Sequence, residues 1–174
     1  AGYFGTKKAC EPLHIQYSYD DRSVVVVNNL LRDCPGLTAE AALLDFDLHP
    51  LFRRTVQLDS PADSVQRIVT LPEVPTATDV TFVRLTLTDR SGRNVSTNFY
   101  WLPRTLSTFD WSQEQAKAHP YYTAVKSYED LTQLNRLPEV LPTATATARH
   151  SPDGEEVAVT VRNPTAHLAF QVHL

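Results

Sequence analysis

The sequence predicts an all-β protein, and three observations carry that prediction. First, residues 23–30 form a valine-dominated run followed by a second apolar run at 40–48, and β-branched side chains suit a pleated, half-buried surface. Second, a similar pair of runs returns at 156–163 and 167–174. Third, turn residues recur so that seven short strands fit within about ninety residues. This pattern is typical of an immunoglobulin-like β-sandwich, here followed by an aromatic linker and a partial second β-sandwich.

Length and composition narrow the classes of protein. The chain has 174 residues, of which 42% are hydrophobic and 21% charged, so it can bury an ordinary core. Its formal net charge is −4, which gives no general electrostatic attraction to nucleic acid or to an anionic membrane. No apolar run approaches the roughly 20 residues that a membrane-spanning helix needs. We therefore expect neither nucleic acid nor membrane as a partner.

The elements of the first part follow in order. Residues 1–11 are expected to end a preceding helix, with Lys7 and Lys8 near the negative end of its dipole and Pro12 stopping it. The domain at 12–104 is then the sandwich, with turns predicted at Asp33–Gly36, Ser60–Asp63 and Asp89–Gly92. Alternating apolar residues predict strands at Pro12–Tyr19, Ser23–Leu30, Glu40–Leu48, Leu51–Asp59, Ser64–Leu71, Asp79–Asp89 and Arg93–Leu102.

Residues 105–137 have a different character, because aromatic residues stand among polar ones without a sustained period. We predict a linker with two short helices, one capped by Asp110 and one at Ser127–Leu134. Residues 138–174 are then expected to supply the first strands of a second, truncated immunoglobulin-like sandwich. These strands are predicted at Thr143–Arg149, Glu156–Asn163 and His167–Leu174, with a hairpin turn at Ser151–Gly154. Three strands are too few for an independent core.

Few residues suggest reaction chemistry. Asp45 and Asp47 lie between apolar positions, and alternation predicts that they face water rather than act as an acid/base pair. None of the six histidines has a partner at metal-binding spacing, so no metal, cofactor or catalytic residue is predicted. For Cys10 and Cys34 we favour two separate thiols over a disulfide, although spacing alone leaves the pairing open.

The aromatic residues allow two interpretations. Phe99 and Trp101 share one face of a predicted strand and Tyr100 takes the other, for which core packing is the default and carbohydrate stacking the minority interpretation. Trp111, Tyr121 and Tyr122 in the linker are better placed for a ligand or a domain interface. The residues do not separate these two uses.

Three segments resemble a known family: Gly5–Asn28, Asn98–Leu102 and Leu106–Trp111. They are similar to the C-terminal region of glycoside hydrolase family 2 enzymes, and most of all to exo-β-D-glucosaminidases and β-mannosidase-like members. The resemblance implies a preceding (β/α)₈ catalytic domain that carries both catalytic glutamates of a retaining mechanism. It also implies a secreted bacterial parent that removes terminal glucosamine or mannose. No family catalytic residue maps onto this chain, so enzymatic activity would belong to the parent.

We therefore expect a non-catalytic accessory region that braces the catalytic barrel of an exo-β-D-glucosaminidase acting on chitosan-type oligosaccharides. The implied partners are that barrel and the rest of the C-terminal sandwich, with an oligosaccharide as a further candidate. The alternatives are a carbohydrate-binding module that uses Trp111, Tyr121 and Tyr122, a β-mannosidase parent, and a free-standing adhesion-type domain.

Overall fold

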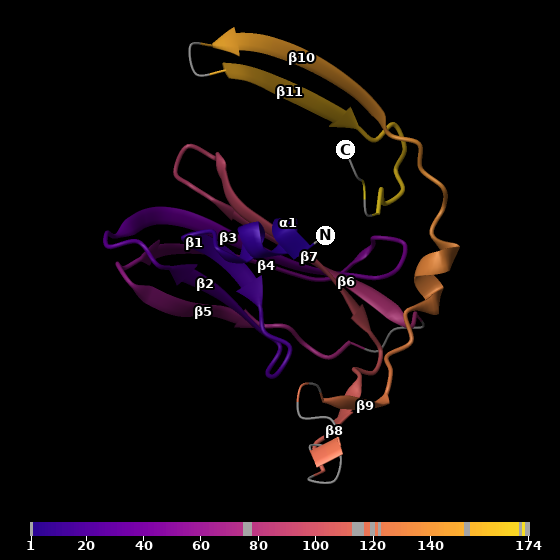
Figure 1. Cartoon of the computed structure of the whole chain (residues 1–174). Helices are drawn as coiled ribbons and strands as arrows, with labels where there is room; N and C mark the ends of the chain where they lie inside the picture. The colour runs from indigo at the N-terminus through magenta and orange to yellow at the C-terminus, as the bar shows by residue number, and fades with distance from the viewer. Residues whose placement is uncertain are drawn as a thin grey trace. The chain divides into compact units, whose positions relative to one another are not determined.

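A computed structural model of the chain describes residues 2–74, 78–112, 117–118, 121, 123–151, 154–170 and 172, without the side chains of residues 4 and 151 (Figure 1). The chain divides into two compact units, Ala1–Leu131 and Thr132–Leu174. Within the described residues, no helix has the length and apolarity required to cross a membrane.

The first unit is a two-layered antiparallel sandwich that follows one short helix. The helix, α1, spans Gly2–Ala9, and Lys7 and Lys8 occupy its last turn as predicted. The smaller sheet has the order β1-β2-β5 and the larger sheet the order β4-β3-β6-β7 (Figure 1). Seven strands, as many as the sequence predicts, make this sandwich: β1 Leu13–Tyr17, β2 Ser23–Asn28, β3 Cys34–Leu44, β4 Pro50–Ser60, β5 Ser64–Thr70, β6 Val80–Thr88 and β7 Asn94–Pro103.

The core lies between the two sheets because each strand sends alternate side chains inward. The valine strand β2 is the middle strand of the smaller sheet, where it pairs with β1 and β5. It does not pair with residues 40–48, which belong to the other sheet. Fully buried aliphatic side chains of both sheets meet in one cluster, among them Ile15, Val24, Val26, Val83, Leu85 and Leu87. Burying each contributes about 1.5–3 kcal/mol before entropy is counted.

Strand β3 begins and ends earlier than the sequence pattern predicts. The predicted turn at Asp33–Gly36 is wrong, because β3 already runs from Cys34 and the irregularity there is a bulge in its pairing with β4. Gly36 takes the required left-handed conformation with φ 70°. The strand stops at Leu44 instead of Leu48, since the Asp45 side chain folds the next residues into a turn. Cys10 and Cys34 are both free thiols, as the favoured interpretation has it.

The linker contains strands where helices were predicted. β8 (Thr108–Asp110) pairs with β9 (Ala124–Ser127), and the predicted helix at Ser127–Leu134 is wrong. Glu129 explains the difference: its N–H donates to Ser107 Oγ and its carboxylate accepts from the Ser107 N–H, each at 3.1 Å. These bonds hold the chain extended, and only a short 3₁₀ helix, η1 (Thr132–Arg136), follows. The helix predicted after Asp110 extends into residues 113–116, which lie outside the described residues.

The second unit is built on one hairpin. β10 (Thr143–Ser151) and β11 (Gly154–Arg162) pair in register along their whole length, as the turn prediction requires. All described side chains of the hairpin are exposed, including those of Val157, Val159 and Val161. The strand predicted at His167–Leu174 is wrong for the described residues. Asn163 instead turns the chain, because its side chain donates to the His167 carbonyl at 2.7 Å and accepts from the Thr165 N–H at 2.9 Å.

Candidate functional site

Two of the three aromatic residues singled out from the sequence are exposed. Trp111 has 77% of its surface accessible and Tyr121 97%, while Tyr122 lies outside the described residues. Trp111 directly follows β8, where the Asp110 carboxylate accepts the Ser112 N–H at 2.9 Å. That hydrogen bond lowers the pKa of Asp110 and fixes the turn that carries the indole. Exposed, locally fixed aromatic rings are the groups on which sugar rings stack.

Phe109 joins Trp111 and was missed from the sequence. Its ring lies 5.9 Å from that of Trp111, centroid to centroid, at an interplanar angle of 55°, and 47% of Phe109 is exposed. The signal was present, because residues two apart on a strand point to the same face. Together the two rings form an exposed aromatic pair at the end of β8.

The aromatic residues of β7 are structural instead. Tyr100 Oη accepts the N–H of Tyr17 on β1 at 3.2 Å, and its ring contacts those of Tyr17 and Tyr19. Asn98 adds a second bond from β7 to β1, to the Ile15 carbonyl at 2.6 Å. Burial raises the pKa of both Tyr17 and Tyr100.

On the other face of β7, Phe99 stacks on buried Phe82 at 5.3 Å. Trp101 shares this face, with 36% of its surface exposed. Core packing therefore accounts for most of the β7 aromatics.

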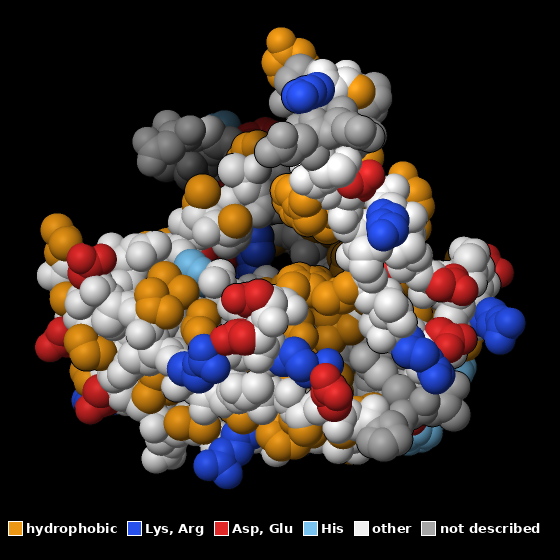
Figure 2. Space-filling view, turned by 90° about the horizontal axis from the view of Figure 1, so that it is seen from below, with side chains coloured by type: hydrophobic (Ala, Val, Ile, Leu, Met, Phe, Trp, Pro, Cys, Tyr) orange, Lys and Arg blue, Asp and Glu red, His pale blue; other side chains and the backbone are white. Residues whose placement is uncertain are grey.

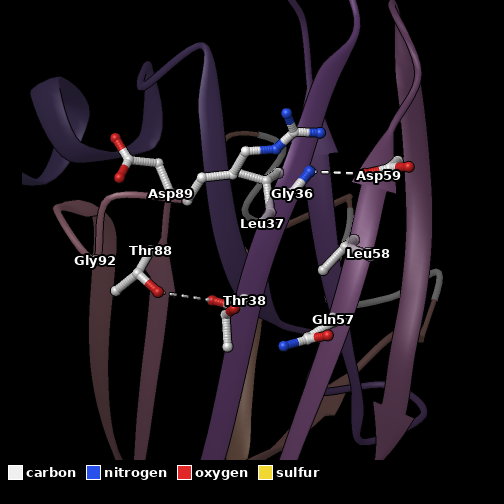
Figure 3. Close-up of a pocket in the computed structure, with 10 residues that line it drawn as sticks. Gly36, Leu37, Thr38, Gln57, Leu58, Asp59, Thr88, Asp89 and Gly92 are labelled. Carbon is white, nitrogen blue, oxygen red and sulfur yellow. Dashed lines mark hydrogen bonds between the residues drawn. The ribbon is translucent and has the colours of Figure 1, made fainter.

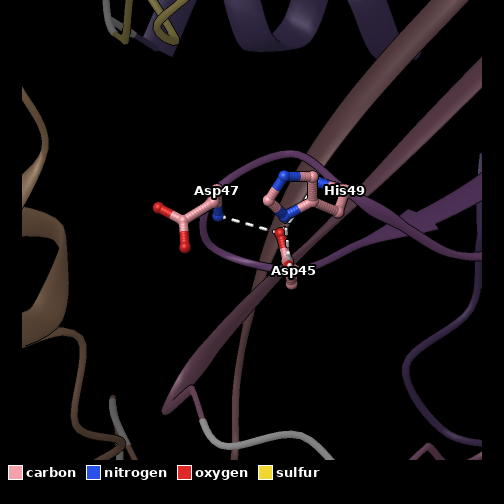
Figure 4. Close-up of side chains that lie close together, drawn as sticks. All are labelled: Asp45, Asp47 and His49. Carbon is pink, nitrogen blue, oxygen red and sulfur yellow. Dashed lines mark hydrogen bonds and ion pairs between the residues drawn. The ribbon is translucent and has the colours of Figure 1, made fainter.

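The loop between β3 and β4 brings three possible ligand groups together. The carboxylates of Asp45 and Asp47 and the His49 ring lie within 4.8 Å of one another (Figure 4). Asp45 Oδ1 accepts the N–H groups of Asp47 and His49 at 2.9 and 2.8 Å, and Oδ2 lies 3.1 Å from His49 Nδ1. The sequence prediction that no histidine has a partner at metal-binding spacing is wrong here, because Asp45 and Asp47 precede His49 by four and two residues. Since Asp45 is already bonded by the turn it stabilises, its arrangement is explained by the loop alone.

A cavity lies at the end of the sandwich where β3 begins and where a turn connects β6 to β7. Its volume is about 640 Å³, and it is lined by polar groups such as Gln57, Asp59 and Thr88 (Figure 3). The Asp59 carboxylate accepts the Gly36 N–H at 2.6 Å. Arg90 lies across Gly36 so closely that a Cβ there would meet its Nε at 2.1 Å. The exposed Arg90 side chain could move aside, but the positive φ of 70° still favours glycine at this position.

None of the described Asp and Glu residues has a raised pKa. A retaining mechanism needs two carboxyl groups about 5–5.5 Å apart, one of them an acid with a raised pKa. Among the described Asp and Glu residues, all those with a shifted pKa have it lowered, namely Glu11, Asp21, Asp89 and Asp110. Figure 2 shows acidic, basic and apolar side chains interspersed over one face of the molecule. What these features define is an immunoglobulin-like module with exposed aromatic and polar side chains.

Comparison with known proteins identifies the module. The family model of the mannosidase Ig/CBM-like domain matches residues 20–105, and that of the exo-β-D-glucosaminidase Ig-fold domain matches residues 120–174. An exo-β-D-glucosaminidase of Streptomyces avermitilis is 42% identical over 99% of this chain and 20% of its own length. One of Amycolatopsis orientalis is 38% identical over 92% of this chain and 16% of its own length.

A solved structure agrees with these matches. The exo-chitosanase of Amycolatopsis orientalis, in complex with PNP-β-D-glucosamine, superposes with a TM-score of 0.85 and 37% identity, covering 95% of this chain and 19% of that one. The chain thus spans about a fifth of the length of the relatives it matches. It belongs to the immunoglobulin-like accessory region of the exo-β-D-glucosaminidases in glycoside hydrolase family 2.

Proposed function

We propose that this chain serves as a non-catalytic brace in an enzyme that removes terminal β-linked glucosamine from chitosan-type oligosaccharides. In this role the sandwich packs against the catalytic (β/α)₈ domain and stabilises it, while both catalytic glutamates belong to that domain. The observation that carries the proposal is similarity along almost the whole chain to about a fifth of each exo-β-D-glucosaminidase. The lowered pKa values of the shifted carboxyl groups support the absence of an acid catalyst among the described residues.

The first test is activity. The pure chain incubated with PNP-β-D-glucosamine should release no nitrophenol above the buffer blank. A chimera should retain activity if this chain replaces the matched fifth of the Streptomyces avermitilis enzyme. The same enzyme without that fifth should melt at a lower temperature and inactivate sooner on heating. Turnover by the pure chain, or a truncated enzyme as stable as the chimera, would contradict the bracing role.

A second candidate function is carbohydrate binding, which the exposed Phe109–Trp111 pair favours. Here Trp111 and Tyr121 would stack on sugar rings. Tyr122, the third residue predicted for this role, lies outside the described residues. This role is compatible with bracing, because the pair lies on the β8–β9 hairpin and not on the sandwich sheets.

Fluorescence separates this candidate from pure bracing. The chain has two tryptophans, so Trp101→Phe leaves Trp111 as the only indole. Chitosan oligomers should then shift the emission of Trp111 until it saturates. In the Trp111→Ala variant only Trp101 fluoresces, and its emission should not shift. An unchanged spectrum of the Trp101→Phe variant at millimolar oligomer would eliminate the binding role.

A further inference from the structure

One end of the sandwich carries an apolar groove where α1 leads into β1. The groove has a volume of about 370 Å³, and Glu11 and Pro12, which connect the helix to the strand, form part of its wall. Its floor is apolar, with Leu13, Leu30, Leu37 and Val95. It shares Leu37 and Asp89 with the polar cavity beneath Arg90, so the two form one continuous surface. We call this the α1-end surface.

The loop at 29–33 carries an exposed leucine, Leu31, at the edge of this surface. Leu31 is 93% exposed, and its neighbours Leu30 and Arg32 both line the groove. The loop is nevertheless fixed. Buried Asn28 donates to the Arg32 carbonyl at 3.1 Å and accepts the Leu30 N–H at 3.0 Å, and the Leu30 carbonyl accepts the Asp63 N–H at 3.0 Å. Because the backbone of this loop is already fixed, docking at Leu31 costs little backbone entropy, as at an interface anchor.

The acidic and basic side chains of this surface differ in whether they are free to bind a partner. Its carboxylates are already engaged: Asp59 by Gly36, Asp89 by the Ser91 and Arg93 N–H groups, and Glu11 by Lys8 and Ser96. The guanidinium groups of Arg32 and Arg90 are exposed and make no hydrogen bond or ion pair with the described residues. Arginine binds carboxylates in a two-pronged geometry. The surface therefore complements a partner that offers an apolar side chain flanked by carboxylates.

We propose that the α1-end surface docks an acidic segment of the catalytic domain in the parent enzyme, with Leu31 as the apolar anchor and Arg32 and Arg90 as carboxylate receptors. This inference rests on the proposed bracing function and assigns it to one end of the sandwich. The helix α1 enters at that end, so a domain joined through it would lie next to the groove. The chain covers only 20% of its Streptomyces relative, which leaves ample protein to supply such a segment.

The test compares each variant in two contexts, the isolated chain and the chimera with the Streptomyces avermitilis enzyme. Leu31→Asp should leave the melting temperature of the isolated chain unchanged but lower that of the chimera by about 2–4 °C, because one polar group is buried at the interface. The double variant Arg32→Glu/Arg90→Glu should do the same, and high salt should reduce its effect. Hydrogen exchange at 29–33 and 89–93 should be at least about tenfold slower in the chimera than in the isolated chain.

Two variants elsewhere on the sandwich serve as matched controls. Val65 on β5 is 66% exposed, and Arg54 on β4 is exposed and makes no ion pair or hydrogen bond with the described residues. Val65→Asp and Arg54→Glu should shift the melting temperatures of chain and chimera equally.

The outcomes separate this inference from the bracing function. If the chimera is more stable than the truncated enzyme but Leu31→Asp and the charge reversals act as the controls do, bracing stands and this surface is wrong. If the chimera gains nothing from the chain, both proposals fail. If the isolated chain forms a dimer that Leu31→Asp dissociates, the surface belongs to a second copy and the inference is overturned.

Discussion

The two units of this chain use the same local sequence in opposite ways. In each, an asparagine stands at the end of a valine-rich strand: Asn28 is the last residue of β2, and Asn163 directly follows β11. Both asparagines turn the chain with their side chains. Yet Asn28 is 0% exposed and β2 lies in the middle of a sheet, whereas Asn163 and the valines of β11 are exposed.

The difference shows that a valine run specifies a strand but not a core. β2 gains its burial from partners distant in the sequence, namely β5 beside it and the larger sheet opposite. Among the described residues β11 pairs with β10 alone, and an isolated two-stranded hairpin is marginally stable in water. Local pattern determines the strand, and long-range partners determine how much that strand contributes to stability.

The largest expected difference between the two units is in the free energy of unfolding lost when a core residue, Leu85, or a hairpin residue is truncated. Leu85 is 0% exposed in the core, so Leu85→Ala should lower the free energy of unfolding by about 2–5 kcal/mol through lost burial and a residual cavity. Val159→Ala in β11, where 44% of the side chain is exposed, should cost below about 1 kcal/mol. Urea unfolding of both variants gives the comparison, and equal losses would mean that the hairpin is buried in solution.

The two asparagines give the next test. Asn28 Nδ2 donates to the carbonyls of Arg32, Ser60 and Pro61 at 3.1, 3.3 and 2.8 Å. Asn28→Ala leaves these acceptors without their donor and should cost about 1–3 kcal/mol. Asn163→Ala exposes its former partners to water and should cost no more than about 0.5 kcal/mol. Thermal unfolding of the two variants measures these losses. A larger loss for Asn163→Ala would show that the buried hydrogen bonds of Asn28 do not contribute more to stability than the exposed ones of Asn163.

The smallest expected effect is a pH dependence at Glu11, which connects α1 to β7. Burial acts to raise the pKa of Glu11, but hydrogen bonds from Lys8 and Ser96, each at 2.8 Å, and nearby positive charge outweigh it and lower the pKa below 4.5. A carboxyl group with a lowered folded-state pKa stabilises above its unfolded pKa and loses that contribution as pH falls through the folded value.

The melting temperature of the wild-type chain should therefore exceed that of Glu11→Gln at pH 7, with the gap closing below about pH 4.5. Ser96→Ala should narrow the same gap. A gap that is constant from pH 7 to pH 3 would show that the Glu11 carboxylate does not stabilise the junction.

The sequence predicted the elements that local periodicity specifies. All seven sandwich strands were predicted from alternation, and the hairpin at 143–162 from its turn residues. The errors fall where side chains bond to distant or irregular backbone. Asp45 ends β3 early, Glu129 holds an apparent helix extended against Ser107, and Asn163 bends the chain before a predicted strand. Only the Glu129–Ser107 bond joins residues far apart, 22 positions, which single-sequence propensity does not include. The bonds of Asp45 and Asn163 reach four residues along the chain and form turns that hydrophobic periodicity does not reveal.

Of the candidate sites, the aromatic pair could be predicted from the sequence and the α1-end surface could not. Exposure of Trp111 followed from its place among polar residues, and Phe109 could have been added from the two-residue period. The α1-end surface could not be predicted, because the loop with Leu31 and Arg32 and the turn with Arg90 are distant in the sequence and only the folded sandwich brings them together.

The two bonds that join β7 to β1 bear on how the chain matures during translation. Tyr100 and Asn98 bond to Tyr17 and Ile15, each pair 83 residues apart in the sequence. These bonds between β1 and β7 can therefore form only after β7 has been synthesised. Until β7 has left the ribosome, β1 lacks these two partners and the incomplete sandwich is open to wrong pairing. Stop codons introduced just before and just after β7 should therefore separate aggregating nascent chains from soluble ones.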